Sequence, residues 1–263
     1  MRTALTIAGS DSGGGAGIQA DLKTFAAFGV YGTSAITALT AQNTVAVTAV
    51  HLAPPAFVVA QIDAVVTDLG CDAVKTGMLA TAAIVEAVAA AIARHHLPNV
   101  VVDPVMVAKS GDHLLAGEAV DAVRRQLVPV ARVVTPNIPE AEVLSGLTIR
   151  TLADAEAAGR AIRAMGARAV IVKGGHLDRD DIVDVLVEGD RLVHLSGPRV
   201  PGVHTHGTGC TFAAAIAARL ALGDDVEAAA RAAQAYVREA MRAGVPLGGG
   251  HRPLDHQWAM RRS

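Results

Sequence analysis

The feature that most constrains this chain is the regular alternation of short apolar runs with longer amphipathic stretches. Residues 4–8 and 100–102 are mainly apolar runs of strand length, typical of strands buried on both faces. After the first run, Ile18, Leu22 and Phe25 recur at the spacing of one helical face. Strands that alternate with helices predict βαβ units. We therefore expect an α/β fold with a mostly parallel, doubly wound central sheet flanked by helices.

The same alternation continues along the rest of the sequence. Residues 183–187 and 191–195 predict an antiparallel hairpin that turns at Gly189-Asp190. No linker rich in Pro, Ser or Gly, no charge run and no repeat divides the chain, so we expect a single domain over residues 1–263. The other predicted strands are residues 31–39, 73–75, 132–134 and 169–173; the other predicted helices are residues 54–69, a helix capped by Thr81, a helix that carries Val120, Val123 and Leu127, and residues 139–144, 153–165, 208–222 and 226–243.

The charge balance argues against a nucleic-acid-binding protein. The chain has 23 Lys and Arg against 25 Asp and Glu, a formal net charge of −2, which leaves no basic excess for a phosphate backbone. Aromatic residues make up 3% of the sequence, too few for base-stacking platforms. We therefore expect a small-molecule ligand and no nucleic acid.

Neither a membrane location nor a disulfide framework is predicted. No apolar run is long enough to span a bilayer, and the first run ends after a few residues at Gly9-Ser10-Asp11, unlike a signal peptide. Cys71 and Cys210 lie far apart without a CxxC motif, so neither a disulfide nor a cysteine zinc site is implied. We expect a cytoplasmic protein without a membrane partner.

Small and polar residues gather at the ends of six predicted strands. Ligands of open α/β sheets bind beyond the carboxyl ends of the strands, so these six ends predict one common site. The first segment is glycine-rich but fits neither the dinucleotide fingerprint nor a Walker A loop. It is either a flexible turn or a backbone that packs closely against a small ligand. The six segments are residues 9–17 (GSDSGGGAG), 40–43 (TAQN), 75–78 (KTGM), 103–106 (DPVM), 135–137 (TPN) and 173–176 (KGGH).

Residues 206–211, HGTGCT, open a long apolar helix. Glycines at a helix N-terminus expose backbone N–H groups at the positive end of the helix dipole, which favours an anion site. The alternative is an ordinary Thr208 N-cap between two turn glycines. Cys210 lies where the dipole would lower a thiol pKa, although a lone cysteine is also typical of a small buried apolar residue.

Lysine is rare in this chain, with only four among the 23 basic residues. Lys109 and Lys173 lie in loop-like motifs, as expected of point charges that bind phosphate. Lys23 fits an exposed position on a helix. Lys75, at the end of a strand, fits either interpretation.

Two carboxylates complete the set of candidate residues. Asp103 ends an apolar strand, where a buried charge needs a partner or a metal. Glu140 lies in the first turn of the next predicted helix, where it is either a favourable helix-end charge or a ligand. A hard cation such as Mg²⁺ takes one or two carboxylates together with phosphate oxygens, and we expect these two to supply them.

These motifs, in this order, resemble those of the hydroxymethylpyrimidine/phosphomethylpyrimidine kinases of thiamine biosynthesis, which belong to the ribokinase-like superfamily. The resemblance runs from Ala4 to about Met241. It is most specific at residues 205–211 (THGTGCT), because most of the superfamily has Gly-Ala-Gly-Asp there, with the Asp as base. It implies a ribokinase-like fold and ATP-dependent phosphorylation of 4-amino-5-hydroxymethyl-2-methylpyrimidine, followed by phosphorylation of its monophosphate to the diphosphate.

The resemblance also implies roles for individual residues. Cys210 stands in place of the usual Asp, and we expect its thiolate either to accept the hydroxyl proton of the substrate in the first phosphorylation or to prepare its loss electrostatically. Residues 253–256 (PLDH) depart from the family pattern and receive no role. The implied roles are hydrogen bonding of the aminopyrimidine by Gln42; lining of its pocket by Gly9, Asp21, Met78 and Val105; an anion hole formed by Gly207, Thr208, Gly209 and Cys210; contacts with ATP by Lys173, Asn137 and Thr208; and Mg²⁺ binding by Asp103 and Glu140.

Two alternatives to this function stay open at this point. One is a pyridoxal/pyridoxine kinase of the same branch, because that substrate also carries a hydroxymethyl group on a six-membered nitrogen ring. The other is a non-catalytic ligand-binding regulator on the same fold, which need not retain Cys210, Lys173 and both carboxylates. The sequence does not determine whether the protein is a monomer or a homodimer.

Overall fold

The computed structural model describes residues 1–106, 117–176, 181–202 and 204–261. Within them, one sheet has nine strands in the order β3-β2-β1-β4-β5-β6-β7-β8-β9. The six strands from β2 to β7 in this order pair in parallel, and β3, β8 and β9 are antiparallel to their neighbours. The predicted α/β fold with a mostly parallel sheet is confirmed. The strands are β1 (Thr3–Asp11), β2 (Tyr31–Gln42), β3 (Val47–Leu52), β4 (Ala73–Thr76), β5 (Val100–Val102), β6 (Val133–Val134), β7 (Ala169–Val172), β8 (Asp181–Glu188) and β9 (Arg191–Pro198).

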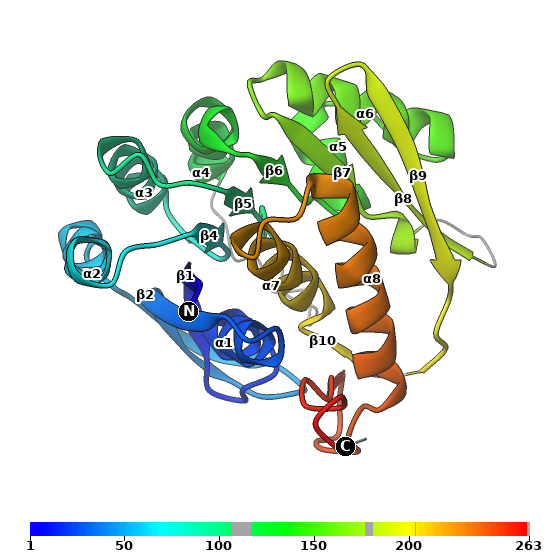
Figure 1. The fold of residues 1–263 in the computed structure, drawn as a ribbon, viewed down its shortest axis with the longest axis horizontal. Coiled ribbons are helices and arrows are strands. Elements are labelled where there is room, and N and C mark those ends of the chain that lie inside the picture. Colours follow the sequence, from blue (N-terminus) through cyan, green and yellow to red (C-terminus); the bar gives the residue numbers. More distant parts are fainter. Residues whose placement is uncertain (107–116, 177–180, 203, 262–263) are drawn as a thin grey trace.

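Helices cover both faces of this sheet (Figure 1). On one face, α1, α7 and α8 enclose a core that includes Phe25 and Ile216. On the other face, α2 to α6 enclose a second core that includes Ile62 and Ile162. The two-sided cover explains why the central strands are continuously apolar. The helices are α1 (Gly17–Ala27), α2 (Pro55–Asp68), α3 (Ala82–Arg94), α4 (Gly117–Ala122), α5 (Ile138–Ser145), α6 (Leu152–Ala164), α7 (Thr208–Ala221) and α8 (Val226–Arg242).

Local sequence explains where several helices begin. The Thr81 side chain accepts a hydrogen bond from the Ile84 amide and so caps α3 as predicted.

Helix α7 has ten buried residues among its fourteen, mostly alanine, because it lies between the sheet, α1 and α8. A helix that is apolar on all sides needs small side chains to be enclosed in this way.

Two regions differ from the predicted elements. The predicted helix through Leu127 is regular only in α4; it continues as a π-helical turn (Val123–Leu127) and ends in a 3-10 turn at Val128–Val130, because Pro129 has no N–H to extend it. Residues 47–52, for which the sequence predicts no element, form β3, an edge strand with largely exposed side chains. A separate small sheet joins β10 (His204–His206) to β11 (Arg252–Pro253).

The sheet reverses its order of connection at β1. The chain places β2 on one side of β1 and β4 on the other, and such a switch opens a crevice beyond the carboxyl ends of the two strands. The glycine-rich segment after β1 and the KTGM segment at β4 therefore border the crevice. The predicted hairpin of β8 and β9 extends the sheet beyond β7.

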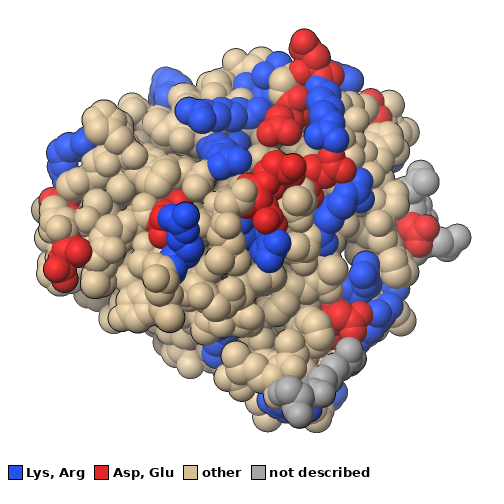
Figure 2. Space-filling view, viewed as in Figure 1, with Lys and Arg blue, Asp and Glu red and all other residues tan. Residues whose placement is uncertain are grey.

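The charges on the surface are mixed. On the face that carries α7 and α8, Lys and Arg side chains lie interspersed with Asp and Glu (Figure 2). The ion pair between Arg231 and Glu227, 2.8 Å long, lies on α8. No helix in the part of the chain that the structure describes has the length and apolar character to cross a bilayer.

Candidate active site

A cavity of about 930 Å³ lies at the carboxyl ends of the parallel strands. All six strand-end segments and the first turn of α7 contribute to its wall, so their predicted convergence is confirmed. Its volume is in the range of small-molecule sites. Lys109 lies outside the described residues. The candidate residues that line the cavity are Gly9, Gln42, Met78, Asp103, Val105, Asn137, Glu140, Lys173, Gly207, Thr208, Gly209 and Cys210.

Asp21 is the candidate that does not line the cavity. Its carboxylate accepts hydrogen bonds from Thr6 at 2.6 Å and from the Lys75 ammonium at 2.9 Å, and both charged side chains are fully buried. Lys75 also contributes to the cavity wall. Burial alone would lower the pKa of Lys75, but Asp21, with smaller contributions from Cys210 and Asp103, outweighs this effect and raises it. The structure therefore places Asp21 behind the wall, as the counterion of a permanently charged lysine.

Lys173 forms the second cationic group of the site. Its ammonium donates to Asp103 Oδ1 at 3.0 Å, and the backbone of the following turn is held by Asp184, which accepts from the Gly174 amide at 2.8 Å. Gln234 of α8 donates to the other oxygen of Asp184 at 2.7 Å. Burial alone would lower the pKa of Lys173, but Asp103 and Glu140 outweigh it and raise the pKa. Hydrogen bonds that involve Asp184 and Gln234 thus stabilise the turn that follows Lys173. The spacing of residues in the sequence does not predict either of these two residues.

Glu140 has the first of the two roles that the sequence left open, at the start of α5, and its role as a ligand stays a prediction. Its side chain accepts from the Asn137 amide at 2.8 Å, and Asn137 Oδ1 accepts from the Glu140 amide at 2.9 Å, a capping box at the start of α5. Glu140 also lines the cavity. Burial raises the pKa of Glu140 to about 7, opposed by the Lys173 charge and reinforced by Asp103.

Asp103 contacts the Lys173 ammonium at 3.0 Å, and Glu140 lies near enough to raise the pKa of Lys173 as well. Among the described residues no group of three or more His, Cys, Asp or Glu side chains is arranged to hold a metal ion. Mg²⁺ does not need such a cage, because it retains waters and takes only one or two carboxylates alongside phosphate oxygens. The two hard oxygen donors therefore fit Mg²⁺ brought with a phosphate ligand.

The N-terminus of α7 is open toward a ligand. Gly207, not Thr208, is the N-cap and supplies no side-chain acceptor, so the alternative of a Thr208 cap is wrong. Gly207 has a φ of +83°, and a Cβ there would lie 1.8 Å from the Gly15 carbonyl oxygen. A Cβ at Gly209 would lie 3.4 Å from Lys173 Nζ. First-turn amides and the Lys173 ammonium thus lie side by side, which suits a bound anion.

The predicted lowering of the Cys210 pKa is not what the structure favours. Burial raises the pKa of the Cys210 thiol to about 11; nearby Lys75 opposes the rise, whereas Asp103 and Asp21 add to it. Desolvation opposes the thiolate more than the helix dipole favours it. The surroundings therefore favour a neutral thiol, and the role of Cys210 in proton transfer stays a prediction.

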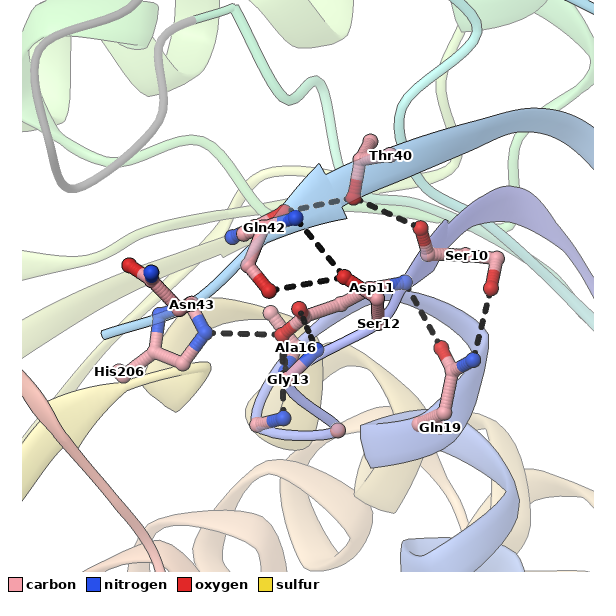
Figure 3. A network of polar contacts seen from close by, with 12 residues as sticks. Ser10, Asp11, Ser12, Gly13, Ala16, Gln19, Thr40, Gln42, Asn43 and His206 are labelled. Atoms are coloured by element: carbon pink, nitrogen blue, oxygen red, sulfur yellow. Dashed lines mark hydrogen bonds and ion pairs between the residues drawn. The ribbon is translucent and has the colours of Figure 1, made fainter. Parts of the chain in front are cut away.

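The opposite wall of the cavity carries the predicted recognition residues. Gln42 Oε1 accepts from the Thr40 hydroxyl at 3.1 Å, and the Gln42 backbone N–H and C=O both bond the Ser12 hydroxyl at 2.8 Å (Figure 3). A Cβ at Gly9 would approach Met78 Sδ to 3.3 Å. The backbone of Gln42 is therefore fixed while its side chain borders the cavity.

The glycine-rich segment between β1 and α1 is more than a flexible turn. A Cβ at Gly15 would lie 2.3 Å from His206 Cδ2, so this loop packs against the residue that precedes α7. Its glycines permit close contact with another part of the same chain, which neither sequence interpretation included. Asp11 and His206, which join the two parts, were not among the candidates.

A charged lysine beside carboxylates and an open helix N-terminus can bind a phosphoryl group and neutralise its developing charge, so this fold and site define a phosphotransferase. Residues 11–255 match the family described as phosphomethylpyrimidine kinase. The chain belongs to that family.

Individual relatives agree with this assignment. The chain is 50% identical over 254 residues to the hydroxymethylpyrimidine/phosphomethylpyrimidine kinase of Bacillus subtilis, covering 96% of this chain and 94% of that protein. It is 51% identical over 252 residues, 96% of this chain, to the thiamine biosynthesis bifunctional protein ThiED of Geobacter sulfurreducens, of which it spans about half, 51%. The solved structure of an ADP complex of Bacillus subtilis pyridoxal kinase matches with a TM-score of 0.91 and 41% identity over 100% of both chains.

These findings confirm the predicted ribokinase-like fold and the predicted class of enzyme, a kinase that uses ATP. They count against the non-catalytic regulator.

Proposed function

We propose that this protein transfers phosphoryl groups from ATP to 4-amino-5-hydroxymethyl-2-methylpyrimidine and then to the resulting monophosphate, giving the diphosphate used in thiamine biosynthesis. The observation that carries the proposal is that one cavity holds both the Lys173–Asp103 pair and, on another wall, Gln42. The names of the relatives described above support the same substrate.

The nucleotide side of the cavity is assigned to Lys173, Asn137 and Thr208. The Lys173 ammonium would exchange Asp103 for phosphate oxygens, because both groups are anionic acceptors at the same cation. Asp103 and Glu140 would hold Mg²⁺. Bound there, Mg²⁺ would neutralise charge on the phosphate oxygens during transfer.

The pyrimidine side is assigned to Gln42, with Gly9, Met78 and Val105 as lining residues. An amide offers both a donor and an acceptor, which matches an aminopyrimidine edge. Asp21 supports this side only through Lys75, since its carboxylate lies behind the wall. Gly9 allows Met78 to approach the backbone of β1 closely.

The transferred group passes over the first turn of α7, whose amides at Gly207, Thr208, Gly209 and Cys210 form the proposed anion hole. The transition state of phosphoryl transfer is loose, so the hydroxyl group needs orientation more than early removal of its proton. A neutral Cys210 is adequate for that task. In the second reaction the attacking phosphate oxygen is already ionised at neutral pH and needs no base.

This role of Cys210 has a direct test. Because the thiol is neutral, we expect Cys210→Ser to change the rates of both phosphorylations by similar factors, measured separately from each purified substrate. A selective loss of the first phosphorylation would instead support proton transfer by Cys210.

The proposed function is tested by adding the pyrimidine and ATP·Mg²⁺ and following both products by ³¹P NMR. Gln42→Leu should weaken pyrimidine binding by about 1–3 kcal/mol, because a buried ligand polar group loses its partner. Gln257→Leu, at an exposed position outside the cavity lining, is the control. ATP consumption that does not depend on the pyrimidine would contradict the proposal.

Pyridoxal phosphorylation is the second candidate, favoured by the TM-score of 0.91 to a pyridoxal kinase. Both substrates present a hydroxymethyl group on a nitrogen heterocycle. A side-by-side comparison of kcat/KM for pyridoxal and the pyrimidine separates the two. We expect the pyrimidine to be the better substrate, because the relatives named for pyrimidine phosphorylation are the more similar in sequence.

Three further assignments belong to this proposal. Residues 1–263 act as one kinase domain, and the need for ATP supports a cytoplasmic location. A homodimer is supported by the exposed apolar side chains of Val50 and Leu52 on β3, at the edge of the sheet. Sedimentation of the wild type against Val50→Glu tests for the dimer.

A further inference from the structure

One buried carboxylate gathers contacts from both ends of the chain. Asp11, at the end of β1, is 2% exposed, and its Oδ1 accepts from the Gly13 amide at 2.8 Å (Figure 3). Its Oδ2 accepts from the amides of Gly15 at 3.0 Å and Ala16 at 2.8 Å, and bonds His206 Nε2 at 2.8 Å. No step of the proposed phosphoryl transfer uses this group.

The charge on Asp11 is retained despite its burial. Burial alone would raise the pKa of Asp11, but the hydrogen bonds from His206 and from the Ala16 and Gly13 amides outweigh it, and the pKa is lowered. All the contacts above are donated to a carboxylate that carries no proton. The same residue therefore shapes the glycine loop and binds the segment before α7.

On one side, the contact leads directly to the proposed anion hole. His206 precedes Gly207, the N-cap of α7. The Gly15 carbonyl lies so close to Gly207 that a Cβ there would be 1.8 Å from its oxygen. The Asp11–His206 pair thus holds the loop against the helix N-terminus without a gap.

On the other side, the contact leads to the proposed pyrimidine reader. Ser12, the neighbour of Asp11, both donates to the Gln42 carbonyl and accepts from the Gln42 amide, each at 2.8 Å. Residues 11–16 therefore touch the Gln42 end of β2 and the start of α7 at the same time (Figure 3). The loop is a rigid spacer between the two walls of the cavity.

We propose that Asp11 and His206 are positioning residues that set the distance between the pyrimidine-binding wall at Gln42 and the phosphoryl-binding first turn of α7. The inference rests on the proposed function for the identity of the acceptor. Transfer depends on the alignment of the attacking oxygen with the phosphoryl group, and a shift of about 1 Å can cost about 10² in rate. Loss of the pair therefore lowers transfer to the pyrimidine more than it weakens the binding of either ligand.

Two substitutions remove the pair and one retains its hydrogen bond. Asp11→Asn replaces one acceptor oxygen by an NH2 group. That group then faces another N–H donor, and one of the backbone amides or His206 loses its acceptor. His206→Ala removes the donor, whereas His206→Gln keeps an N–H at a similar reach. Asp63→Asn is the control, because it removes the charge from an Asp–His contact of 2.6 Å that joins α2 to His95, the C-cap of α3, on the opposite face of the sheet from α7.

Thermal unfolding of each variant is measured first. The values of kcat and KM for the pyrimidine and ATP, and the ATP hydrolysed without pyrimidine, are then measured below the melting range of every variant. We expect Asp11→Asn and His206→Ala to lose about 10-fold to 10²-fold in kcat, with each KM within about threefold of wild type. The fraction of ATP turned over without product should rise in both variants. His206→Gln should recover most of kcat, and Asp63→Asn should match wild type.

The proposal is overturned by wild-type kcat in folded Asp11→Asn and His206→Ala. A fall in kcat that His206→Gln shares with His206→Ala, or one that Asp63→Asn reproduces, also overturns it in favour of a structural role. Failure of the wild-type protein to phosphorylate the pyrimidine contradicts the proposed function instead. The two failures are therefore distinguished within one set of assays.

Discussion

Two lysine–aspartate pairs border the cavity with nearly the same geometry and opposite surroundings. Lys75 meets Asp21 at 2.9 Å with both side chains 0% exposed, and Lys173 meets Asp103 at 3.0 Å with the lysine side chain 16% exposed. Asp21 directs one oxygen to both Thr6 and Lys75, and its other oxygen is buried without a hydrogen-bond partner among the described residues.

Both lysines are charged, so the exposure of the ammonium, not its charge, decides which of the two a ligand can reach. The Lys75 charge is neutralised by a partner that it cannot leave, since no solvent reaches either group. The Lys173 charge lies against a carboxylate at the cavity wall, and in the proposed function it moves to an incoming phosphate. We therefore call Lys75–Asp21 the closed pair and, on the proposed function, Lys173–Asp103 the exchangeable pair.

The largest effect expected from this comparison is on stability at the closed pair. Lys75→Met leaves the Asp21 carboxylate buried without its cation, and such losses cost about 3–5 kcal/mol. Urea unfolding should show this decrease, and Lys75→Met combined with Asp21→Leu should recover most of it. A decrease of less than about 1 kcal/mol in the free energy of unfolding would mean that water reaches the Lys75–Asp21 pair, as it does the Lys173–Asp103 pair.

The same change at the exchangeable pair should affect the reaction instead. Lys173→Met removes the ammonium that, in the proposed function, contacts the transferred phosphoryl group. The loss of one such donor costs about 10²–10³ in kcat. Its free energy of unfolding should fall less than that of Lys75→Met, because water can reach the site. Equal destabilisation by the two lysine substitutions, with kcat of Lys173→Met retained, would reverse the assignment of the pairs.

The acidic neighbour of the exchangeable pair should make stability depend on pH. The pKa of Glu140 is raised by burial to about 7, so the folded state retains this proton while the unfolded state loses it near the ordinary value of 4.5. Stability should therefore fall as the pH rises from about 4.5 to 7, by about 3 kcal/mol. Chemical unfolding in EDTA across this range should show a flatter profile for Glu140→Gln. Identical slopes for the two proteins would remove Glu140 as the cause.

The smallest effect concerns the metal. Glu140→Ala should raise the Mg²⁺ concentration for half-maximal activity by about 10-fold, the lower end for loss of a group at a metal site. The Kd for the pyrimidine, measured by calorimetry without nucleotide, should stay unchanged. An unaltered Mg²⁺ requirement would leave Glu140 only its capping role at α5.

The alternation of strands and helices was sufficient to predict the fold, because the apolar periods of the central strands and of α1 and α3 are strong. The alternation did not predict β3, because its six residues lie at an exposed edge of the sheet and their apolar side chains do not recur at every second position. The convergence of the strand ends followed from the general topology of open sheets. The walls of the cavity were therefore predictable, whereas the depth of each side chain in them was not.

Burial is set by tertiary packing, which local sequence does not encode. Lys75 and Lys173 each end a strand before small residues, so sequence could not separate them. Cys210 occupies the predicted helix start, but enclosure beside Asp103 reverses the expected direction of its pKa. Asp11 and His206 are 195 residues apart, and no spacing rule joins them.

The position of α7 in the chain has a consequence for biosynthesis. The nine-stranded sheet is complete at residue 198, but the helix that fills the core on one of its faces begins only at residue 208. During synthesis at about 5–20 residues per second, residues 199–263 take roughly 3–13 s to emerge. For much of that interval the nascent chain presents, beside the ribosome, an apolar sheet face that only α1 covers. Chaperone binding and aggregation should therefore concentrate on ribosome-bound chains of this length.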